Sequence, residues 1–292
     1  MPTKPRNDAS LVPAVPGSGR HAGDISVQDI CAVLLVGGLG TRLQSVVSSK
    51  PKSLATIGNS SFLALLVRQL RCQGIRRIVI CTGYLAEQIE NEFGDGRDWE
   101  VAIQYSKEPC PLGTAGALKL AQPHIHNGSD FLVMNGDSLI EIDFGQMLRL
   151  HQQVGGMATL AVRKVKNASL YGTVEVDAAK RVVGCTEKTG SNAPGLVNAG
   201  VYVFKRAIFE HIPEGPVSLE REVFPRLLDY GVYALQEHGM FIDIGTPDDY
   251  ARAQKASNRL YQAALHHQSD SCADKGSSAR GHCATAPDVE VE

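Results

Sequence analysis

The chain has 292 residues, 43% of them hydrophobic and 21% charged, and its formal net charge is -2. This length and hydrophobic content are enough to bury one substantial α/β core, and the near-neutral charge argues against a nucleic-acid-binding protein. Because no apolar run approaches the roughly 18–20 residues of a membrane span, we expect no membrane partner either.

The two ends of the chain differ from its middle. Residues 1–28 are rich in proline and glycine, residues 263–292 are small and polar, and neither has a hydrophobic pattern, so we expect disordered tails there. The first residues lack the apolar stretch of a secretory signal. The seven cysteines form no Cys-x-x-Cys pair, which is typical of reduced thiols rather than disulfides or a zinc site. We therefore expect a cytoplasmic protein, whose assembly into a homo-oligomer is left open.

Between the tails, strand-like and helix-like patterns alternate. Short apolar runs predict buried strands at 31–36, 77–81, 101–105 and 130–134. Amphipathic patterns between them predict helices at about 60–73, 84–93, 113–121 and 143–153. Such alternation is typical of a mainly parallel sheet covered by helices on both faces. We therefore expect an α/β fold of three Rossmann-like layers, with its site at the carboxyl ends of the strands.

From residue 156 onward the pattern becomes β-rich. Strands are expected at 157–162, 171–176, 181–185 and 199–204, and helices return near 218–229 and 246–262. We interpret residues 29–262 as one domain with a first half at 29–155 and a second half at 156–262. The second half inserts an extra sheet region that would complete a pocket above the first half.

A glycine-rich loop follows the first predicted strand. Gly37, Gly38 and Gly40 are followed by two basic residues, Arg42 and Lys52. Glycines let backbone N–H groups approach phosphate oxygens and the cations offset the phosphate charge, so this pattern predicts a polyphosphate site. The stretch from residue 30 to residue 86 contains no acidic residue, which indicates that something anionic binds near it. Its basic residues are Arg42, Lys50, Lys52, Arg68, Arg71, Arg76 and Arg77.

Two common phosphate-binding loops do not match this segment. A P-loop needs a Lys-Ser or Lys-Thr pair directly after its last glycine, and no such pair follows here. A dinucleotide fingerprint needs a third glycine where this chain has Leu43, and a carboxylate about 20 residues further on, where this chain has no acidic residue.

The segment 37–43, together with Pro51 and Lys52, resembles the signature of the sugar-1-phosphate nucleotidyltransferases, over roughly residues 30–258. The resemblance implies a nucleotide-diphospho-sugar transferase fold of the GT-A-like type, in which the loop wraps a nucleoside triphosphate. It also implies that Arg42 and Lys52 stabilise phosphate charge while the α-phosphate is attacked. In the loop, the residues it assigns to the nucleotide are Leu35, Gly37, Gly38, Gly40 and Thr41.

Two aspartates end apolar runs that are far apart in the chain. Asp137 follows the run at 130–134, and Asp243 follows an apolar pair at 241–242. Because strand ends point into the cleft, these carboxylates are placed to hold Mg²⁺, which prefers carboxylate, water and phosphate oxygens. Both match the metal-binding aspartates of the family, which implies a Mg²⁺ cofactor and a catalytic role. The alternatives are an Asn-Gly-Asp turn for Asp137 and a helix cap for Asp243.

The segment 108–116 resembles the base-reading loop of the family, which assigns Glu108, Gly113 and Thr114 to the nucleotide. A carboxylate only accepts hydrogen bonds, and guanine presents two adjacent donors, N1–H and N2–H₂, that one carboxylate can accept together. Thymine and uracil present a single donor between two carbonyls, so Glu108 favours GTP. The alternative is that Glu108 points to solvent beside Lys107.

Three segments of the second half match family segments near the sugar. The resemblance assigns the sugar phosphate to Gly172, Glu187, Lys188 and Asn198, with Lys188 taking the 1-phosphate. Without the resemblance, a Glu-Lys pair is more often a solvated surface patch. The segment 218–225 resembles the GDP-mannose pyrophosphorylase side of the family, and its alternative is an amphipathic helix capped by Ser218.

We therefore predict an enzyme that transfers GMP from GTP to a sugar 1-phosphate and releases pyrophosphate, by positioning and charge neutralisation without a covalent intermediate. Ser45 and Ser53 depart from the family pattern, which argues against its thymidylyl branch. The resemblance is greatest to the guanylyltransferases of D-glycero-α-D-manno-heptose 1-phosphate, which implies a role in surface polysaccharide or glycan synthesis. The alternatives are mannose 1-phosphate as substrate, a uridylyl- or thymidylyltransferase on a hexose 1-phosphate, and a catalytically silent nucleotide-sugar-binding regulator.

Overall fold

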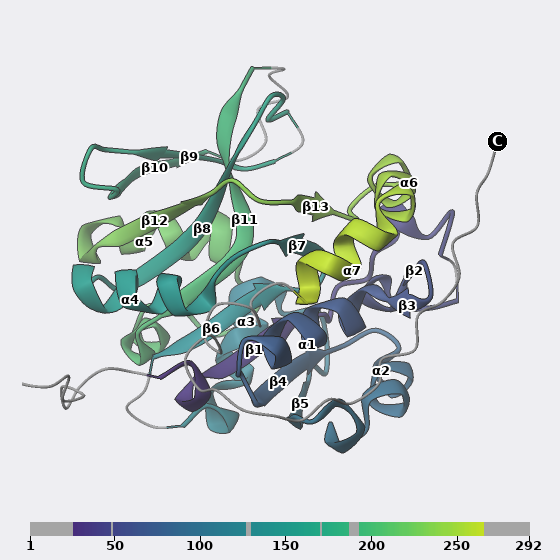
Figure 1. Ribbon diagram of the computed structural model, residues 1–292. Helices are drawn as coiled ribbons and strands as arrows, with labels where there is room; N and C mark the ends of the chain where they lie inside the picture. The colour runs from purple at the N-terminus through teal and green to yellow at the C-terminus, as the bar shows by residue number, and fades with distance from the viewer. Residues whose placement is uncertain (1–25, 48, 127–129, 170, 187–192, 266–292) are drawn as a thin grey trace, which may run out of the picture.

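The computed structural model describes residues 26–47, 49–126, 130–169, 171–186 and 193–265. Its centre is a nine-stranded sheet with the order β10-β9-β11-β6-β1-β4-β5, to which β8 and β12 are joined through β11 (Figure 1). The first strands of this sheet are β1 (Cys31–Leu35), β4 (Arg77–Thr82), β5 (Ala102–Lys107) and β6 (Phe131–Asn135). The later strands are β8 (Ala158–Val165), β9 (Thr173–Val176), β10 (Val182–Thr186), β11 (Gly195–Phe204) and β12 (Val232–Glu237).

The first half of the chain builds the parallel part of the sheet. β1 runs parallel to both β4 and β6, and β4 runs parallel to β5. Leu35 at the end of β1 lies between Cys81 of β4 and Asn135 of β6, so these strands end together at one edge. The second half adds β11 antiparallel to β6 and β8, and β12 parallel to β8. The predicted parallel sheet with a β-rich insertion is confirmed.

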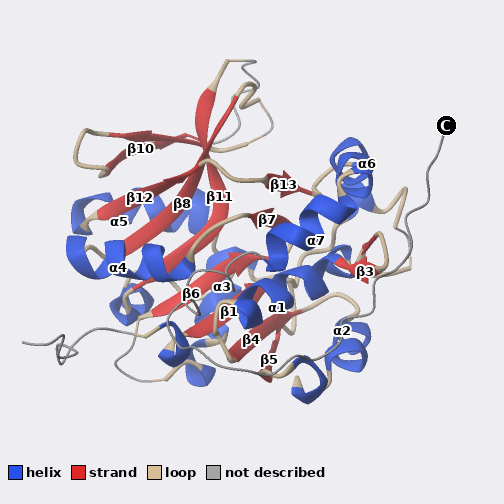
Figure 2. Cartoon of the chain, in the orientation of Figure 1, coloured by secondary structure: helices blue, strands red, loops and turns tan. Residues whose placement is uncertain are grey.

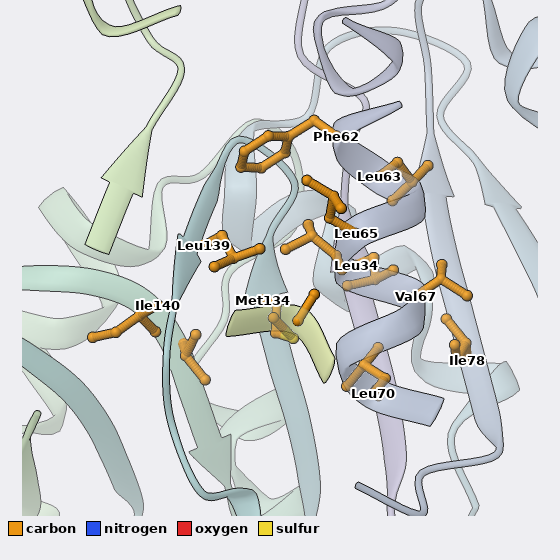
Figure 3. Close-up of a cluster of buried hydrophobic side chains, with 14 of the residues drawn as sticks. Leu34, Phe62, Leu63, Leu65, Val67, Leu70, Ile78, Met134, Leu139 and Ile140 are labelled. Carbon is orange, nitrogen blue, oxygen red and sulfur yellow. The ribbon is translucent and has the colours of Figure 1, made fainter. Parts of the chain in front are cut away.

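Helices cover both faces of the sheet, as Figure 2 shows. They are α1 (Phe62–Cys72), α2 (Ala86–Phe93), α3 (Gly113–Leu120), α4 (Phe144–Val154), α5 (Phe224–Leu227), α6 (Pro247–Lys255) and α7 (Ser257–Leu265). Successive residues of β1 belong to two separate cores, because strand side chains alternate between faces. Leu34 packs with Phe62 and Leu70 of α1 (Figure 3), whereas Val33 belongs to the core that contains Leu118 of α3. The three predicted layers are therefore present.

Most predicted elements lie within a few residues of their expected bounds, but the region at 218–229 differs. It begins as a π-helix (Leu219–Val223), continues as the short helix α5 and ends in a 3-10 turn (Leu228–Tyr230). The carbonyl of Ser218 accepts from both Glu222 and Val223, which widens the first turn. Pro225 then lacks the N–H that a regular helix would use. One further prediction, a single helix at 246–262, is wrong because the chain forms α6 and α7 instead.

The predicted tails lie almost entirely outside the described residues. The inner end of the first tail belongs to a 3-10 turn (Val27–Asp29). The inner end of the second tail belongs to α7, which extends to Leu265. None of the helices in the described part of the chain is long and apolar enough to cross a membrane. The cysteines that the structure describes are all free, namely Cys31, Cys72, Cys81, Cys110 and Cys185.

A short two-stranded sheet that the sequence pattern missed connects distant parts of the chain. β7 (Ser138–Ile140) pairs antiparallel with β13 (Phe241–Asp243), and a second small hairpin, β2 (Thr56–Ile57) with β3 (Ser60–Ser61), precedes α1. The buried Gln69 of α1 donates from Nε2 to the carbonyl of Ile140 at 2.7 Å. Gln73 donates to the carbonyl of Ile142 at 2.8 Å. Side-chain amides from α1 and its C-cap residue thus hold the end of β7 and the segment that follows it.

Replacing Gln69 with leucine should lower the free energy of unfolding. The Ile140 carbonyl would then be buried without a partner, at a cost of about 1–3 kcal/mol. Urea denaturation followed by circular dichroism measures this loss. The control Gln104→Leu lies on the exposed side of β5 and should change stability by no more than about 0.5 kcal/mol. Equal effects of the two substitutions would contradict the assignment.

Candidate active site

Two adjoining cavities open at the carboxyl ends of the parallel strands. The larger, which we call the loop cavity, has a volume of about 460 Å³ and is lined by residues 35–42 of the glycine loop and by residues 111–117 around the start of α3. The smaller, which we call the sheet cavity, has a volume of about 240 Å³ and is lined mainly by β9, β10 and the segment from the end of β13 into α6. The walls of both include Arg42, Asn135, Asp137 and Gly245. Molecules in the two cavities would therefore meet at these residues.

The structure brings together every residue that the sequence assigned to the nucleotide. All of them line the loop cavity, namely Leu35, Gly37, Gly38, Gly40, Thr41, Glu108, Gly113 and Thr114. The loop leaves β1 and turns at Gly40, whose φ of 59° starts a 3-10 turn (Thr41–Leu43). A Cβ atom at Gly40 would also lie 2.9 Å from Cβ of Lys52. Glycine is required here because the loop passes directly over the lysine.

Only two of the basic residues of this region reach the cavities. Arg42 lines both, and Lys52, at the start of the 3-10 turn Lys52–Leu54, lines the loop cavity. The guanidinium of Arg68 instead lies over the rings of Trp99 and Tyr261, 5.6 and 5.2 Å from their centroids. Arg71 pairs with Glu100, Arg76 donates to the carbonyl of Arg71, and Arg77 donates to the carbonyl of Asp29. Of the basic residues in the acid-free segment, Arg42 and Lys52 are therefore the ones placed to offset the charge of an anion in the cavities.

The two predicted metal aspartates come together through the pairing of β7 with β13. Asp243 lies opposite Ser138, and the amide of Ile244 donates to the carbonyl of Asp137 at 2.9 Å. Nζ of Lys52 is 2.8 Å from Oδ2 of Asp137. Burial, and next the negative charge of Asp137, raises the pKa of Asp243 to about 6, while Lys52 partly opposes this. The site therefore carries two crowded carboxylates and one ammonium group.

This arrangement fits a hard divalent cation. Two carboxylates that raise each other's free energy are stabilised when a cation binds between them, and Mg²⁺ favours such oxygen ligands. Among the described residues, no group of three or more His, Cys, Asp or Glu side chains is arranged to hold a metal. An ion at Asp137 and Asp243 would thus take the rest of its ligands from substrate phosphate and water. The alternative of a helix cap for Asp243 is wrong, because Thr246 caps α6.

The carboxylate of Glu108 is anchored inside the site rather than exposed. Its Oε2 accepts from the amide of Leu112 at 2.9 Å, and it lies against Gly37, where a Cβ atom would be 2.0 Å from Oε1. Half-burial raises the pKa of Glu108, and the hydrogen bond from Leu112 partly opposes this. The alternative that Glu108 points to solvent beside Lys107 is wrong.

The sheet cavity contains some predicted sugar residues and several that the prediction missed. Gly172 and Asn198 line it, whereas Glu187 and Lys188 lie outside the described residues. The missed polar residues of its wall are Asn135, Tyr171, Thr173, Thr186, Glu220, Thr246 and Asp249. For Glu220 a signal existed in the segment 218–225, which the sequence pattern also allowed as an ordinary helix. Ser218 does cap this segment by accepting from the amide of Arg221, as the helix interpretation predicted, although the segment begins as a π-helix.

Comparison with known proteins agrees with this geometry. The family model described as "Nucleotidyl transferase" matches residues 31–259. D-glycero-alpha-D-manno-heptose 1-phosphate guanylyltransferase of Aneurinibacillus thermoaerophilus is 40% identical over 77% of this chain and 96% of its own length. Mannose-1-phosphate guanylyltransferase of Mycobacterium tuberculosis is 36% identical over 78% of this chain. The chain spans only 64% of the length of that second relative.

Solved structures show the same architecture. HddC from Yersinia pseudotuberculosis, in complex with GMP-PN, superposes with a TM-score of 0.70 at 31% identity and covers 77% of this chain and 98% of its own. A putative glucose-1-phosphate thymidylyltransferase from Bacillus anthracis, at 19% identity and a TM-score of 0.72 over 80% of this chain and 99% of its own, shares the fold. The fold is that of the nucleotidyltransferases with a GT-A-like sheet. The chain belongs to the nucleotidyl transferase family.

Removing the charge of Lys52 should strongly impair nucleotidyl transfer. Lys52→Met keeps the length of the side chain but takes a fixed cation from the phosphates. By analogy with the loss of one oxyanion-hole donor, this should cost about 10²–10³ in turnover, measured as pyrophosphate release. Lys50→Met is the control, because Lys50 is exposed and lines neither cavity. A Lys52→Met variant that changes only KM would contradict a role in the transition state.

Proposed function

We propose that this protein transfers GMP from GTP to a sugar 1-phosphate and releases pyrophosphate. The observation that carries the proposal is the common wall of the two cavities at Arg42 and Asp137. A nucleotide in the loop cavity and a sugar phosphate in the sheet cavity would place the α-phosphorus and the attacking 1-phosphate oxygen there. Holding two reactants in this way supplies most of the catalysis that phosphoryl transfer needs.

Each charged residue at the common wall has a definable task. The glycine loop offers backbone N–H groups to the phosphates, and Arg42 and Lys52 offset negative charge as the 1-phosphate oxygen attacks in line. Asp137 and Asp243 would hold Mg²⁺, which when bound supplies further neutralisation of phosphate charge. Lys52 contacts Asp137 and lines the loop cavity, so it is placed between the carboxylate pair and the phosphates. A silent nucleotide-sugar regulator would not need this full set of charges.

Guanine recognition is assigned to Glu108. Its Oε2 is already fixed by the amide of Leu112, yet each carboxylate oxygen has two lone pairs, so both oxygens can still accept from N1–H and N2–H₂. The guanylyltransferase names of the relatives and the GMP-PN complex of HddC support GTP over UTP or dTTP.

For the sugar, we propose D-glycero-α-D-manno-heptose 1-phosphate. The heptose relative is the more similar of the two at 40% identity, and the chain matches 96% of its length. Mannose 1-phosphate is the second candidate, supported by relatives at 36% identity that are longer than this chain. Gly172 and Asn198 would bind the sugar in the sheet cavity, and Glu187 with Lys188 are assigned to it by the sequence resemblance alone. Such an activity would serve surface polysaccharide or capsule synthesis, and the free cysteines support a cytoplasmic location.

The direct test is pyrophosphate release from GTP, UTP or dTTP with a panel of sugar 1-phosphates. We expect turnover with GTP and heptose 1-phosphate to give the highest kcat/KM. Preference for mannose 1-phosphate would replace the proposed sugar, and preference for UTP or dTTP would overturn the base assignment. Absence of turnover with every pair would favour the silent regulator.

Glu108→Gln should change the nucleotide preference while leaving the loop intact. The amide oxygen of glutamine can still accept from Leu112, so only the pairing with the base changes. Its NH₂ group would face a guanine donor, and kcat/KM for GTP should fall by an amount equivalent to about 2–4 kcal/mol. The values for UTP and dTTP should rise, because the amide can donate to a pyrimidine carbonyl. Equal losses for the three nucleotides would mean that Glu108 only braces the loop.

Loss of either carboxylate at the metal site should abolish turnover without unfolding the protein. Asp137→Asn, Asp243→Asn or excess EDTA should each remove activity, whereas Asp248→Asn, on the exposed start of α6, should not. The raised pKa of Asp243 means that its ionised form destabilises the fold above about pH 6. In EDTA at pH 8, Asp243→Asn should therefore melt at the same or a higher temperature than the wild type. Full activity in EDTA would contradict the metal assignment.

A further inference from the structure

A chain of side-chain hydrogen bonds crosses from the sheet cavity to the loop cavity. Its centre is Glu220, which belongs to the π-helix Leu219–Val223 and lines the sheet cavity. The phenol of Tyr202 donates to Oε1 of Glu220 at 3.2 Å, and the hydroxyl of Thr114 donates to Oε2 at 2.8 Å. Thr114 itself lines the loop cavity. One carboxylate thus connects the walls of both cavities.

The Tyr202 end fixes the direction of these hydrogen bonds. Tyr202 is fully buried, and its phenol accepts from Nδ2 of Asn198 at 3.0 Å and is also hydrogen-bonded to Asn135. Burial, and next the charge of Glu220, raises the pKa of Tyr202 far above its usual value. The phenol therefore stays protonated and donates a hydrogen bond to Glu220.

Glu220 retains acceptor capacity toward the sheet cavity. Within the described part of the chain, Oε2 accepts from Thr114 and from Ser218, the latter at 3.2 Å, and Oε1 accepts from Tyr202. Since a carboxylate oxygen has two lone pairs, Oε1 has one left for a donor in the cavity. The same cavity is lined by the apolar side chains Leu160, Val174 and Phe224. Apolar surface beside an unfilled acceptor suits a sugar ring, which presents C–H groups and hydroxyl donors together.

The position of Glu220 depends on the turn that carries Thr114. The amide of Leu219 donates to the hydroxyl oxygen of Thr114 at 2.8 Å, and the amide of Val217 donates to the carbonyl of Leu112 at 2.8 Å. Gly113 has a φ of +71°, and a Cβ atom there would lie 2.5 Å from the carbonyl oxygen of Val217. The turn at 112–116 and the segment 217–220 are therefore packed and bonded as one unit.

We propose that Glu220 accepts a hydroxyl group of the sugar, and that Thr114, although it lines the loop cavity, is a positioning residue for the sugar through its bond to Glu220. The inference rests on the proposed sugar-1-phosphate guanylyltransferase activity. This role differs from the nucleotide binding that the sequence resemblance assigned to Thr114. The hydroxyl of Thr114 donates to Glu220 and accepts from the amide of Leu219, so we assign its hydrogen bonds to these residues rather than to the nucleotide.

The test measures KM and kcat for both substrates, using GTP with D-glycero-α-D-manno-heptose 1-phosphate and, separately, with D-mannose 1-phosphate. Thr114→Val keeps the shape of the side chain but removes its hydrogen bonds. It should raise KM for the sugar 1-phosphate about 3- to 10-fold while KM for GTP stays within about twofold. Thr114→Ser should restore the wild-type values, because the hydroxyl returns. Glu220→Gln should lower kcat/KM for the sugar 1-phosphate about tenfold or more.

Two comparisons separate positioning from a general structural effect. Thr82→Val is the matched control, since the buried hydroxyl of Thr82 has no hydrogen-bond partner among the described residues and its loss should leave both KM values unchanged. In the double variant Thr114→Val with Glu220→Gln, the effect of the threonine change should largely disappear, because the two residues act through one bond. If Glu220→Gln does not fold, Thr114→Val and Thr114→Ser decide the question alone.

The possible failures are distinguishable. A wild type without turnover on any sugar 1-phosphate would overturn the proposed function. A wild type with turnover, in which Thr114→Val raises KM for GTP and not for the sugar, would overturn only this inference and return Thr114 to the nucleotide. A fall in kcat with both KM values unchanged and a lower melting temperature would show a purely structural role, which also overturns it.

Discussion

The site is organised around the repulsion between two carboxylates that the fold forces together. The pairing of β7 with β13 fixes Asp137 and Asp243 as neighbours, although more than a hundred residues separate them in the chain. In the described residues, Lys52 makes the ion pair with Asp137 and leaves Asp243 with a raised pKa. A folded protein keeps such an unfavourable arrangement only where the rest of the structure holds it in place. Here the buried Gln69 of α1 holds the carbonyl of Ile140 in β7, and the amide of Gly245, in the turn before α6, donates to Oδ1 of Asp243.

Close approaches at glycines also fix the positions of groups in the site. The glycine loop passes over Lys52, Glu108 lies against Gly37, and Gly113 approaches the backbone of residue 217. In each case a missing side chain lets a charged or polar group take a fixed position instead of a flexible one. Preorganised groups of this kind need little rearrangement when a charged ligand arrives, which is the main source of electrostatic catalysis.

Local pattern was sufficient for the parallel half of the sheet, and the family resemblance named residues that the structure places around the loop cavity. Asp137 and Asp243 could be found because each ends an apolar strand, and strand ends meet at one edge. The run of basic residues did not show which of them reach the cavities, because sequence proximity does not set side-chain direction, and Arg68 instead lies over Trp99 and Tyr261. Glu220 was missed for a related reason. Its role depends on tertiary contacts with Thr114 and Tyr202 that no periodicity encodes.

Hydrogen bonds join the turn at 112–116 to the segment 217–220, and this connection limits how the proposed sugar site could be re-engineered. These contacts join residues that are more than a hundred positions apart in the chain. A substitution in one stretch therefore affects the position of the other. An engineer who grafts only the later stretch from a relative would leave its carboxylate without the hydroxyl that aligns it. Transplanted specificity would have to move both stretches together, with Gly113, which lets them touch.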